Sequence, residues 1–439
     1  MKKKYRIILY TSIFLLCVVA SIILVVKKSN SVYEEESKPK VVKHKSMLSM
    51  NLEQTAGSGD YKTVTQSSWP TEGYKFNAEL SKCENGSTLS WDDTKKAVIM
   101  QGNVSDKCYV YFDIWIPSIA DYCTSGTDLA TCVKNFGDQG PSVSNIYIHN
   151  SSLTNGAGDN SYRYAGANPN NFVCFGSDAS PCPIDNLYRI IGVFGENYHG
   201  ANGKQLVKLI KYDYMTTDEL GTDGDYSQTY KEWGMDSTYK GTYGDGERIG
   251  VYYWNYKATG SATNTWSTSL LNKTNLNTNF INNIGTTWAN KIATVTWKVG
   301  GNTWANIGTK TSSVAYTNEI TNPVTTNTTD NATTYSAKIG LMYVSDYGFA
   351  ASPDAWTLTM SSYNNTTATN NNWMYMGLYE WTISRDADNS NLAFFVLSDG
   401  RVSRFNVGYY RGVRASFNLE SSVSYESGSG SMSDPIVIN

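Results

Sequence analysis

The chain has 439 residues, of which 17% are charged and 13% are aromatic, with 32 Tyr and 12 Trp. Ten of its 36 Lys and Arg residues, but only three of its 39 Asp and Glu residues, lie in the first 45 positions, so the rest of the chain is acidic. That charge argues against a nucleic acid partner, and the length provides material for one large or two smaller folded domains.

Residues 7–26 form an uninterrupted hydrophobic segment without a charged residue. At about 1.5 Å of rise per residue, a helix of this length spans the hydrocarbon core of a membrane, which is about 30 Å thick. A cleaved secretory signal has a shorter apolar region that ends in small residues, whereas this segment runs directly into Lys27 and Lys28. The basic cluster in residues 1–6 favours a cytoplasmic N-terminus. The sequence therefore predicts an uncleaved signal-anchor in the cell membrane, with the bulk of the chain extracellular.

Besides Cys17 inside that segment, the chain has six cysteines, all on the predicted outer side. An even number of cysteines in an oxidising compartment predicts disulfides. We expect sequential pairing because each bond then stays within one local segment: Cys83–Cys108, Cys123–Cys132 and Cys174–Cys182. A metal site is the weaker interpretation, since there is no Cys-x-x-Cys and the histidines are scattered. We expect no metal and no cofactor.

Composition and periodicity divide the outer part of the chain into four segments. Residues 27–70 are rich in Lys, Glu, Ser and Gly and lack hydrophobic periodicity, which predicts a disordered stalk. Residues 71–118 contain short β-forming stretches separated by turn formers, which predicts a small antiparallel β unit. Residues 119–185 are a transitional, disulfide-containing segment with a short helix, and residues 186–439 form the main domain. The predicted fold class is α+β and rich in strands.

Within the main domain, residues 187–194 and 205–211 predict two strands joined by a Gly- and Asn-rich turn. Residues 266–280 predict a short helix with Ser267 or Thr268 as its N-cap. Residues 300–337 are rich in Thr and Asn and predict a long surface excursion. Further short strands are expected at residues 339–344, 380–383, 393–397, 401–405 and 413–419.

Five sequence blocks in this region have a recognisable pattern: residues 162–171, 187–192, 339–348, 380–385 and 412–414. In these blocks the chain resembles an uncharacterised family of bacterial surface domains, over about residues 160–439. The resemblance implies a C-type-lectin-like domain, in the variant also found in formylglycine-generating enzymes. It places residues 412–414 in the core and residues 389–411 in a surface hairpin.

The resemblance implies no activity, since that of the family is unassigned. Formylglycine-generating enzymes use a cysteine pair late in the domain, whereas this chain has no cysteine after Cys182. The Glu-Pro-Asn, Gln-Pro-Asp and Trp-Asn-Asp triplets of calcium-dependent lectins are also missing from the sequence. We therefore expect neither that enzyme activity nor a calcium-dependent sugar site of that kind.

No catalytic constellation is evident in the sequence. There is no Gly-x-Ser-x-Gly motif, and His149 is best interpreted as a polar residue at the end of a strand. A glycosidase needs only two carboxylates roughly 5–10 Å apart. The candidates are Glu380, Asp386, Asp346 and Asp354, and for each a solvated or hydrogen-bonding role is the better interpretation. The prediction is that the chain is not an enzyme.

Aromatic residues are concentrated in the last hundred positions, where they can stack on sugars or anchor a protein interface. Trp373 and Trp381 are expected in the core of the domain. A second group combines aromatic, Arg and Asn side chains and is expected to be exposed as a ligand-binding surface: Arg404, Asn406, Tyr409, Tyr410 and Arg411.

These features predict a membrane-anchored extracellular binding or adhesion protein that recognises a surface glycan or protein. One alternative is a surface enzyme acting on glycan or peptide, and another is a purely structural envelope protein. A pocket with two close carboxylates of perturbed pKa would favour the enzyme, and an aromatic face without them would favour the binding protein.

Overall fold

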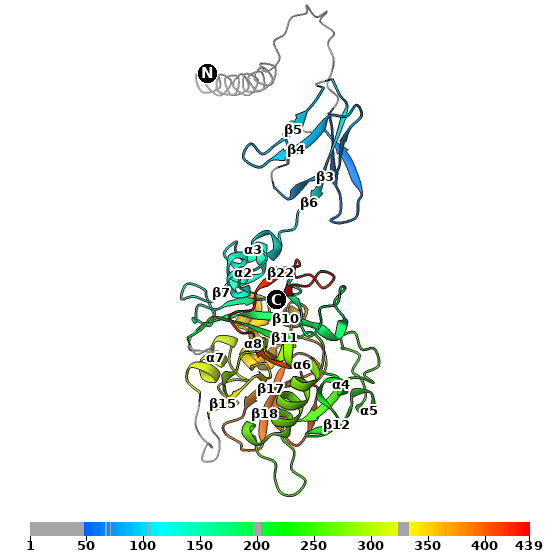
Figure 1. Cartoon of the computed structure of the whole chain (residues 1–439). Coiled ribbons are helices and arrows are strands. Elements are labelled where there is room, and N and C mark those ends of the chain that lie inside the picture. Colours follow the sequence, from blue (N-terminus) through cyan, green and yellow to red (C-terminus); the bar gives the residue numbers. More distant parts are fainter. Residues whose placement is uncertain are drawn as a thin grey trace, which may run out of the picture. The chain divides into compact units, whose positions relative to one another are not determined.

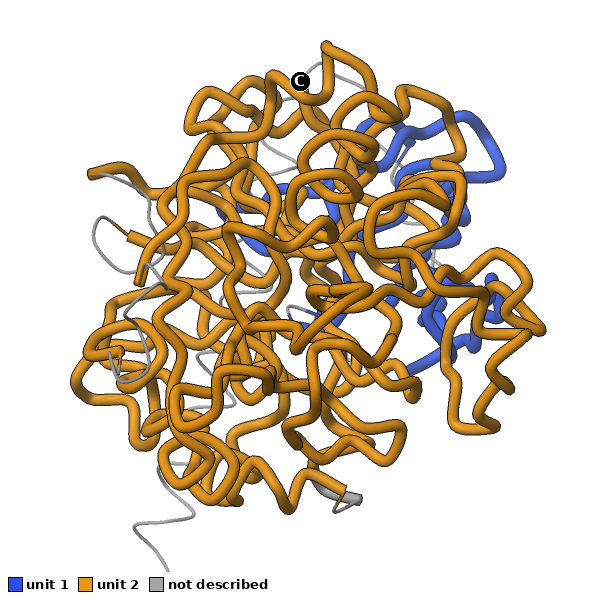
Figure 2. The backbone as a smooth tube through the Cα atoms, turned by 90° about the horizontal axis from the view of Figure 1, so that it is seen from below, with its two compact units in different colours: residues 1–116 blue, residues 117–439 orange. Residues whose placement is uncertain are grey.

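The computed structural model describes residues 48–439 except for residues 66–67, 71, 104, 196–202, 324–332 and 365. The chain divides into two compact units, residues 1–116 and residues 117–439 (Figures 1 and 2). The predicted cytoplasmic tail (1–6), the predicted membrane helix (7–26) and the stalk up to residue 47 lie outside the described residues. Within the described part of the chain, no helix is both long and apolar enough to cross a membrane.

The first unit is built from strands alone. A four-stranded sheet has the order β2-β1-β6-β3, in which β1 and β6 are parallel and the other neighbours antiparallel, and β4 and β5 form a separate hairpin. The strands are β1 (Leu48–Glu53), β2 (Tyr61–Val64), β3 (Tyr74–Cys83), β4 (Thr88–Asp92), β5 (Ala97–Gln101) and β6 (Cys108–Ile114).

Strands β1 and β2 correct the expectation of a disordered stalk up to residue 70. Met50 and Leu52 of β1 are buried against Val110 and Phe112 of β6, so this part of the chain belongs to the core of the β unit. In the sequence these apolar residues alternate with polar ones over only six residues, and the polar Asn51 and Glu53 are buried as well. A short pattern of this kind is easily lost in a polar segment.

The second unit is organised around a seven-stranded sheet of order β16-β21-β11-β10-β8-β7, with β9 also paired to β10. Its central strands, β10 and β11, have every residue buried, as expected for apolar runs covered on both faces. The strands are β7 (Ile146–Ile148), β8 (Tyr162–Tyr164), β9 (Phe172–Cys174), β10 (Leu187–Phe194), β11 (Leu206–Lys211), β16 (Ile339–Gly340) and β21 (Ser416–Asn418).

Gly192 allows β8 to approach β10. A Cβ atom at this position would lie 2.2 Å from the carbonyl oxygen of Tyr162, and the β10–β11 register shifts between Ile190 and Gly192. Only a residue without a side chain fits such an approach. The glycine therefore holds β8 against the central sheet.

Four small sheets surround the large one. They have the orders β12-β13-β20, β17-β18-β19, β14-β15 and β22-β23. Their strands are β12 (Tyr226–Thr229), β13 (Gly250–Tyr253), β14 (Val295–Lys298), β15 (Thr334–Ala337), β17 (Glu380–Arg385), β18 (Leu392–Val396), β19 (Val402–Asn406), β20 (Tyr410–Arg411), β22 (Tyr425–Ser427) and β23 (Val437–Ile438).

The helices are short and lie between these strands. In Figure 1, α2 and α3 are found at the end of the unit that also holds β7 and β22, and Asp128, the N-cap of α2, is bridged to Ser424. The α-helices are α2 (Leu129–Gly137), α3 (Pro141–Ser144), α4 (Thr217–Leu220), α5 (Tyr230–Trp233), α6 (Ile281–Ala289), α7 (Ser312–Tyr316), α8 (Val344–Ala350) and α9 (Thr366–Asn370). The 3₁₀-helices are η1 (Ile119–Asp121), η2 (Ile184–Asn186), η3 (Trp266–Thr268), η6 (Pro353–Thr357) and η7 (Met360–Ser362), and the π-helices are η4 (Leu271–Phe280) and η5 (Thr317–Thr321).

The structure confirms a mixed, strand-rich α+β class and changes the expected boundaries. Residues 119–185 are not a separate transitional segment, because β7, β8 and β9 from this range join the central sheet. The expected helix at 266–280 is divided into η3 and the π-helix η4, and Thr265, rather than Ser267 or Thr268, occupies the N-cap position of η3.

Residues 300–337 also differ from the expected surface excursion. Ile307, Ala315 and Ile320 are buried in the main core, as is the carboxylate residue Glu319. The carboxylate of Glu319 accepts hydrogen bonds from the backbone N–H groups at the start of α8. Glu319 is therefore a polar residue that satisfies buried backbone groups rather than one that faces water.

The three expected disulfides are present. Cys83–Cys108 joins two directly opposed residues of β3 and β6 in the first unit. Cys123–Cys132 ties a loop to α2, and Cys174–Cys182 ties the end of β9 to the loop before η2. Each bond therefore crosslinks one local segment.

Candidate ligand-binding pocket

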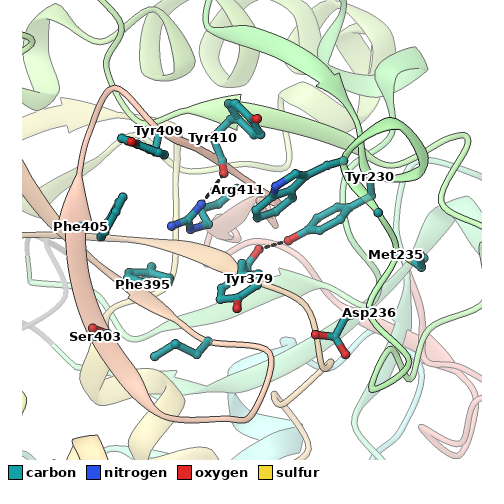
Figure 3. A pocket seen from close by; sticks show the side chains of 13 residues that line it. Tyr230, Met235, Asp236, Tyr379, Phe395, Ser403, Phe405, Tyr409, Tyr410 and Arg411 are labelled. Carbon is teal, nitrogen blue, oxygen red and sulfur yellow. Dashed lines mark hydrogen bonds between the residues drawn. The ribbon is translucent and has the colours of Figure 1, made fainter.

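The second unit contains a pocket of about 730 Å³, shown in Figure 3. Seven of its 13 lining residues are aromatic, and the rest include one Arg, one Asp and one Ser. We call it the aromatic pocket. It is lined by Tyr230, Trp233, Gly234, Met235, Asp236, Tyr379, Phe395, Leu397, Ser403, Phe405, Tyr409, Tyr410 and Arg411.

One wall of the aromatic pocket is a face of the β18–β19 hairpin. Phe395 of β18 lies directly opposite Ser403 of β19, and Phe405 follows two residues later. Side chains two residues apart in a strand share a face, so these three side chains line the same wall (Figure 3). Phe405 is 40% exposed although it is large and apolar.

The opposite wall comes from α5 and the loop after it. Thr229 and Glu232 form a capping box, in which each side chain bonds the other's backbone N–H. This cap fixes the helical turn that places Trp233 at the pocket, with its ring 5.4 Å from the ring of Tyr379 and 5.4 Å from that of Tyr410. The hydroxyl of Tyr230 donates to the carbonyl oxygen of Tyr379, which links α5 to the residue before β17.

Strand β20 supplies the remaining aromatic residues and the cation. Tyr410 and Arg411 pair with Tyr253 and Tyr252 of β13, which fixes their backbone. Tyr409, just before this strand, is 53% exposed, and its ring packs edge-on against Phe405 at 4.7 Å. The rim of the pocket is therefore formed by exposed aromatic rings.

The charged groups of the pocket lie at separate places on its wall. Figure 3 shows Arg411 among the rings of Phe395, Tyr379 and Tyr410, and Asp236 at the other side of Tyr379. Burial lowers the pKa of Arg411. Burial acts to raise the pKa of Asp236, but hydrogen bonds from Thr238 and Ser398 outweigh it, so that this pKa lies below its usual value.

The five residues predicted to form a ligand-binding surface therefore lie on two different faces of the structure. Tyr409, Tyr410 and Arg411 line the pocket, whereas Arg404 and Asn406 do not. Arg404 and Asn406 alternate along β19 with Ser403 and Phe405, so they face the other side of the hairpin.

On that other side, Arg404 pairs with the buried carboxylate of Asp386 and lies over the ring of Trp304 at 5.7 Å. The side-chain oxygen of Asn406 accepts a hydrogen bond from the backbone N–H of Gly408. Both side chains thus have structural roles on the far side of the hairpin. The expectation that Arg411 is exposed is also wrong, because this residue is only 7% exposed.

The expected core residues are confirmed, since Trp373 is 3% exposed and Trp381 is fully buried. Val413 and Arg414 are buried as well, as expected for the late Gly-Val-Arg segment. Residues 389–411, predicted to be a surface hairpin, include the buried strand β18. This strand is buried because it lies between β17 and β19 in its sheet.

None of the four candidate carboxylates lines the aromatic pocket. Glu380 is paired with Arg414, Asp346 with Lys208, and Asp386 with Arg404, and all three acids are buried. Asp354 lies exposed in η6. Among the described residues, no group of three or more His, Cys, Asp or Glu side chains is arranged to hold a metal ion.

Sequence reasoning missed the α5 wall, which comes from about 150 residues before the rest of the pocket. Tyr230, Trp233 and Asp236 were not singled out. The Thr229-x-x-Glu232 capping box was the available signal, because it marks the start of a helical turn directly before Trp233. It does not reveal which distant strand that turn packs against.

Comparison with known protein families, characterised proteins and solved structures finds no match for this chain. The pocket itself therefore carries the functional argument.

Proposed function

We propose that the second unit is an extracellular binding module and that the aromatic pocket takes a glycan. The observation that supports this most directly is a cavity of about 730 Å³ walled by aromatic rings with a few polar groups among them. Its volume lies in the usual range for small-ligand sites, about 300–1,000 Å³. The faces of aromatic rings provide an apolar surface for the C–H groups of a sugar. The hydroxyl groups of the sugar form hydrogen bonds with the polar side chains of the pocket wall.

The exposed rings support a binding role over a purely packing role. Phe405 and Tyr409 are 40% and 53% exposed and contact each other at the pocket rim. Water-exposed aromatic rings around a cavity are typical of a ligand site, because their hydrophobic free energy is gained only when a ligand covers them. Asp236 is the one carboxylate that lines this pocket, which gives no support to a two-carboxylate glycosidase there.

We also propose that the module is held at the cell surface by residues 7–26. The support is the length and charge-free character of that segment in the sequence. The three disulfides support an oxidising compartment for the folded part of the chain. The resemblance to a C-type-lectin-like domain is part of the same proposal, and its support is the order of the sequence blocks between residues 162 and 414.

The test is a glycan-array screen with the full chain in nanodiscs, followed by titration of the best ligand. We expect Tyr409→Ala and Trp233→Ala to weaken binding at least 10-fold, since each removes a ring from the pocket wall. Tyr256→Ala is the matched control, because Tyr256 is 48% exposed but does not line the pocket. The proposal fails if no glycan binds, or if the pocket variants bind as well as the control.

A further inference from the structure

Arg411 is the most unusual residue of the aromatic pocket. Its guanidinium lies close to the rings of five aromatic side chains, with centroid distances from 4.7 to 5.5 Å, and it is 7% exposed. The rings belong to Trp233, Tyr379, Trp381, Phe395 and Phe405.

No carboxylate among the described residues forms a salt bridge with Arg411. Of the other buried or half-buried arginines, Arg163, Arg404 and Arg414 pair with an Asp or Glu. Arg189 and Arg385 resemble Arg411 in donating to neutral acceptors. The guanidinium of Arg411 donates to the carbonyl oxygen of Tyr410, at 2.8 Å from Nη1, and of these three arginines only Arg411 lines the aromatic pocket. Its Nε atom is buried without any hydrogen-bond partner.

This arrangement is costly in the free protein. Cation–π contacts with the rings offset part of the desolvation of the guanidinium. A buried charge without a counter-ion and a buried donor without an acceptor both remain unfavourable. A bound anion would remove this cost, and the pocket that Arg411 lines provides space for one.

We propose that Arg411 recognises the carboxylate of an acidic sugar bound in the aromatic pocket. This inference rests on the proposed glycan-binding function and specifies its ligand class. The sugar ring stacks on the aromatic wall, and its carboxylate accepts charge-assisted hydrogen bonds from the guanidinium. Asp236, on the other side of Tyr379, disfavours a second anionic group at that place and so orients the ligand.

Uronic acids, muramic acid and sialic acids share this chemistry of a ring bearing a carboxylate. The experiment therefore uses one oligosaccharide from each class, each paired with an analogue in which the carboxylate is replaced by a neutral group. Binding of the full chain in nanodiscs is measured by calorimetry for every pair. The quantity of interest is the ratio of the two affinities in each pair.

For the class that is the ligand, we expect the acidic sugar to bind roughly 10- to 100-fold more tightly than its neutral analogue, as for a hydrogen bond to a charged group. In Arg411→Met, which replaces the cation by an apolar chain of similar length, we expect the ratio to fall to about one. The neutral analogue should bind this variant with nearly unchanged affinity. Arg411→Lys keeps the charge and should retain an intermediate ratio, which provides a second reading if the Met variant does not fold.

Arg401→Met is the control, because Arg401 is an exposed arginine at the β18–β19 turn, pairs with Asp399 and does not line the pocket. A wild-type ratio near one in all three classes, or an unchanged ratio in both Arg411 variants, would overturn the inference about Arg411. In those cases the neutral sugars still bind, so the proposed glycan function survives. Absence of binding to every acidic and neutral sugar would overturn both.

Discussion

Arg414 and Glu380 form a two-point salt bridge inside the second unit. Nε and Nη2 of Arg414 donate to the two carboxylate oxygens of Glu380 at 2.8 and 3.0 Å, and both side chains are at most 2% exposed. Glu380 begins β17 and is bridged to Gly412. The pair therefore fixes the segment after β20, next to the strand that carries Arg411.

Removing one partner of this pair should strongly destabilise the second unit. In Glu380→Ala the guanidinium of Arg414 stays buried without its counter-ion, and we expect the free energy of unfolding to fall by about 3–5 kcal/mol. Urea unfolding measured by near-ultraviolet circular dichroism provides the value. Glu247→Ala is the control, since the Lys231–Glu247 pair is exposed and its loss should leave the unfolding midpoint unchanged.

His149 should make the stability of the second unit depend on pH. It is buried between the rings of Phe349 and Trp356, and its Nδ1 accepts a hydrogen bond from the backbone N–H of Ala157, so burial holds its pKa well below 6.5. The unfolded chain binds a proton at this residue below about pH 6.5 and the folded chain does not, so stability is lost as the pH falls through that value.

In His149→Gln this contribution is removed. When the pH is lowered from 7 to 5, we expect the free energy of unfolding of the wild type to fall by about 2 kcal/mol more than that of the variant. Urea titrations at both pH values measure it. A difference that stays constant over this range would show that His149 is protonated in the folded state.

Gly412→Ala should disturb the pocket through its supporting residues. A Cβ atom at residue 412 would lie 2.8 Å from the ring of Tyr214 and 2.9 Å from that of Tyr230, both of which are fully buried or nearly so. We expect a loss of about 1–3 kcal/mol in stability, as for other overpacked sites. Thermal unfolding compares it with Gly195→Ala, where the added Cβ meets no atom within 4 Å. Equal melting temperatures for the two variants would contradict this packing.

The disulfide Cys83–Cys108 should stabilise the first unit alone. It closes a loop of 25 residues, which in the chain-entropy model corresponds to about 3.5 kcal/mol. In the double Ser variant we expect faster backbone hydrogen exchange in β1, β3 and β6 and no change in β10 and β11. Mass spectrometry of the full chain measures both regions at once, and faster exchange in β10 would contradict independent folding of the two units.

The parts of the fold that the sequence predicted best are those with a strong local pattern. The apolar runs at 187–194 and 205–211 correspond to β10 and β11, and the short helix expected within residues 119–185 corresponds to α2. The prediction failed where polar side chains are buried and form hydrogen bonds with the backbone. The stretch around Glu319 looks like a loop in the sequence because its carboxylate hydrogen-bonds buried backbone groups, which no local pattern reveals.

The candidate site was predicted in part for a similar reason. Tyr409, Tyr410 and Arg411 line the aromatic pocket, but the alternation of β19 turns Arg404 and Asn406 to the other face. The alternation could have been read from the sequence, had the strand been placed first. The burial of Arg411 could not have been predicted from the sequence, because the rings around it come from α5, β18, β19, and β17 with the residue before it.

The central sheet also sets a condition on when this unit can form during synthesis. Phe172 and Cys174 of β9 donate backbone hydrogen bonds to Gly430 and Ile436, and β11 pairs with β21, so these strands are completed by residues much later in the chain. Strand β11 therefore lacks its partner β21 until residue 418 has been made, which delays completion of the central sheet. A product cut short before residue 416 would leave the β21 edge of β11 unpaired, and we expect proteases to degrade it faster than the full chain.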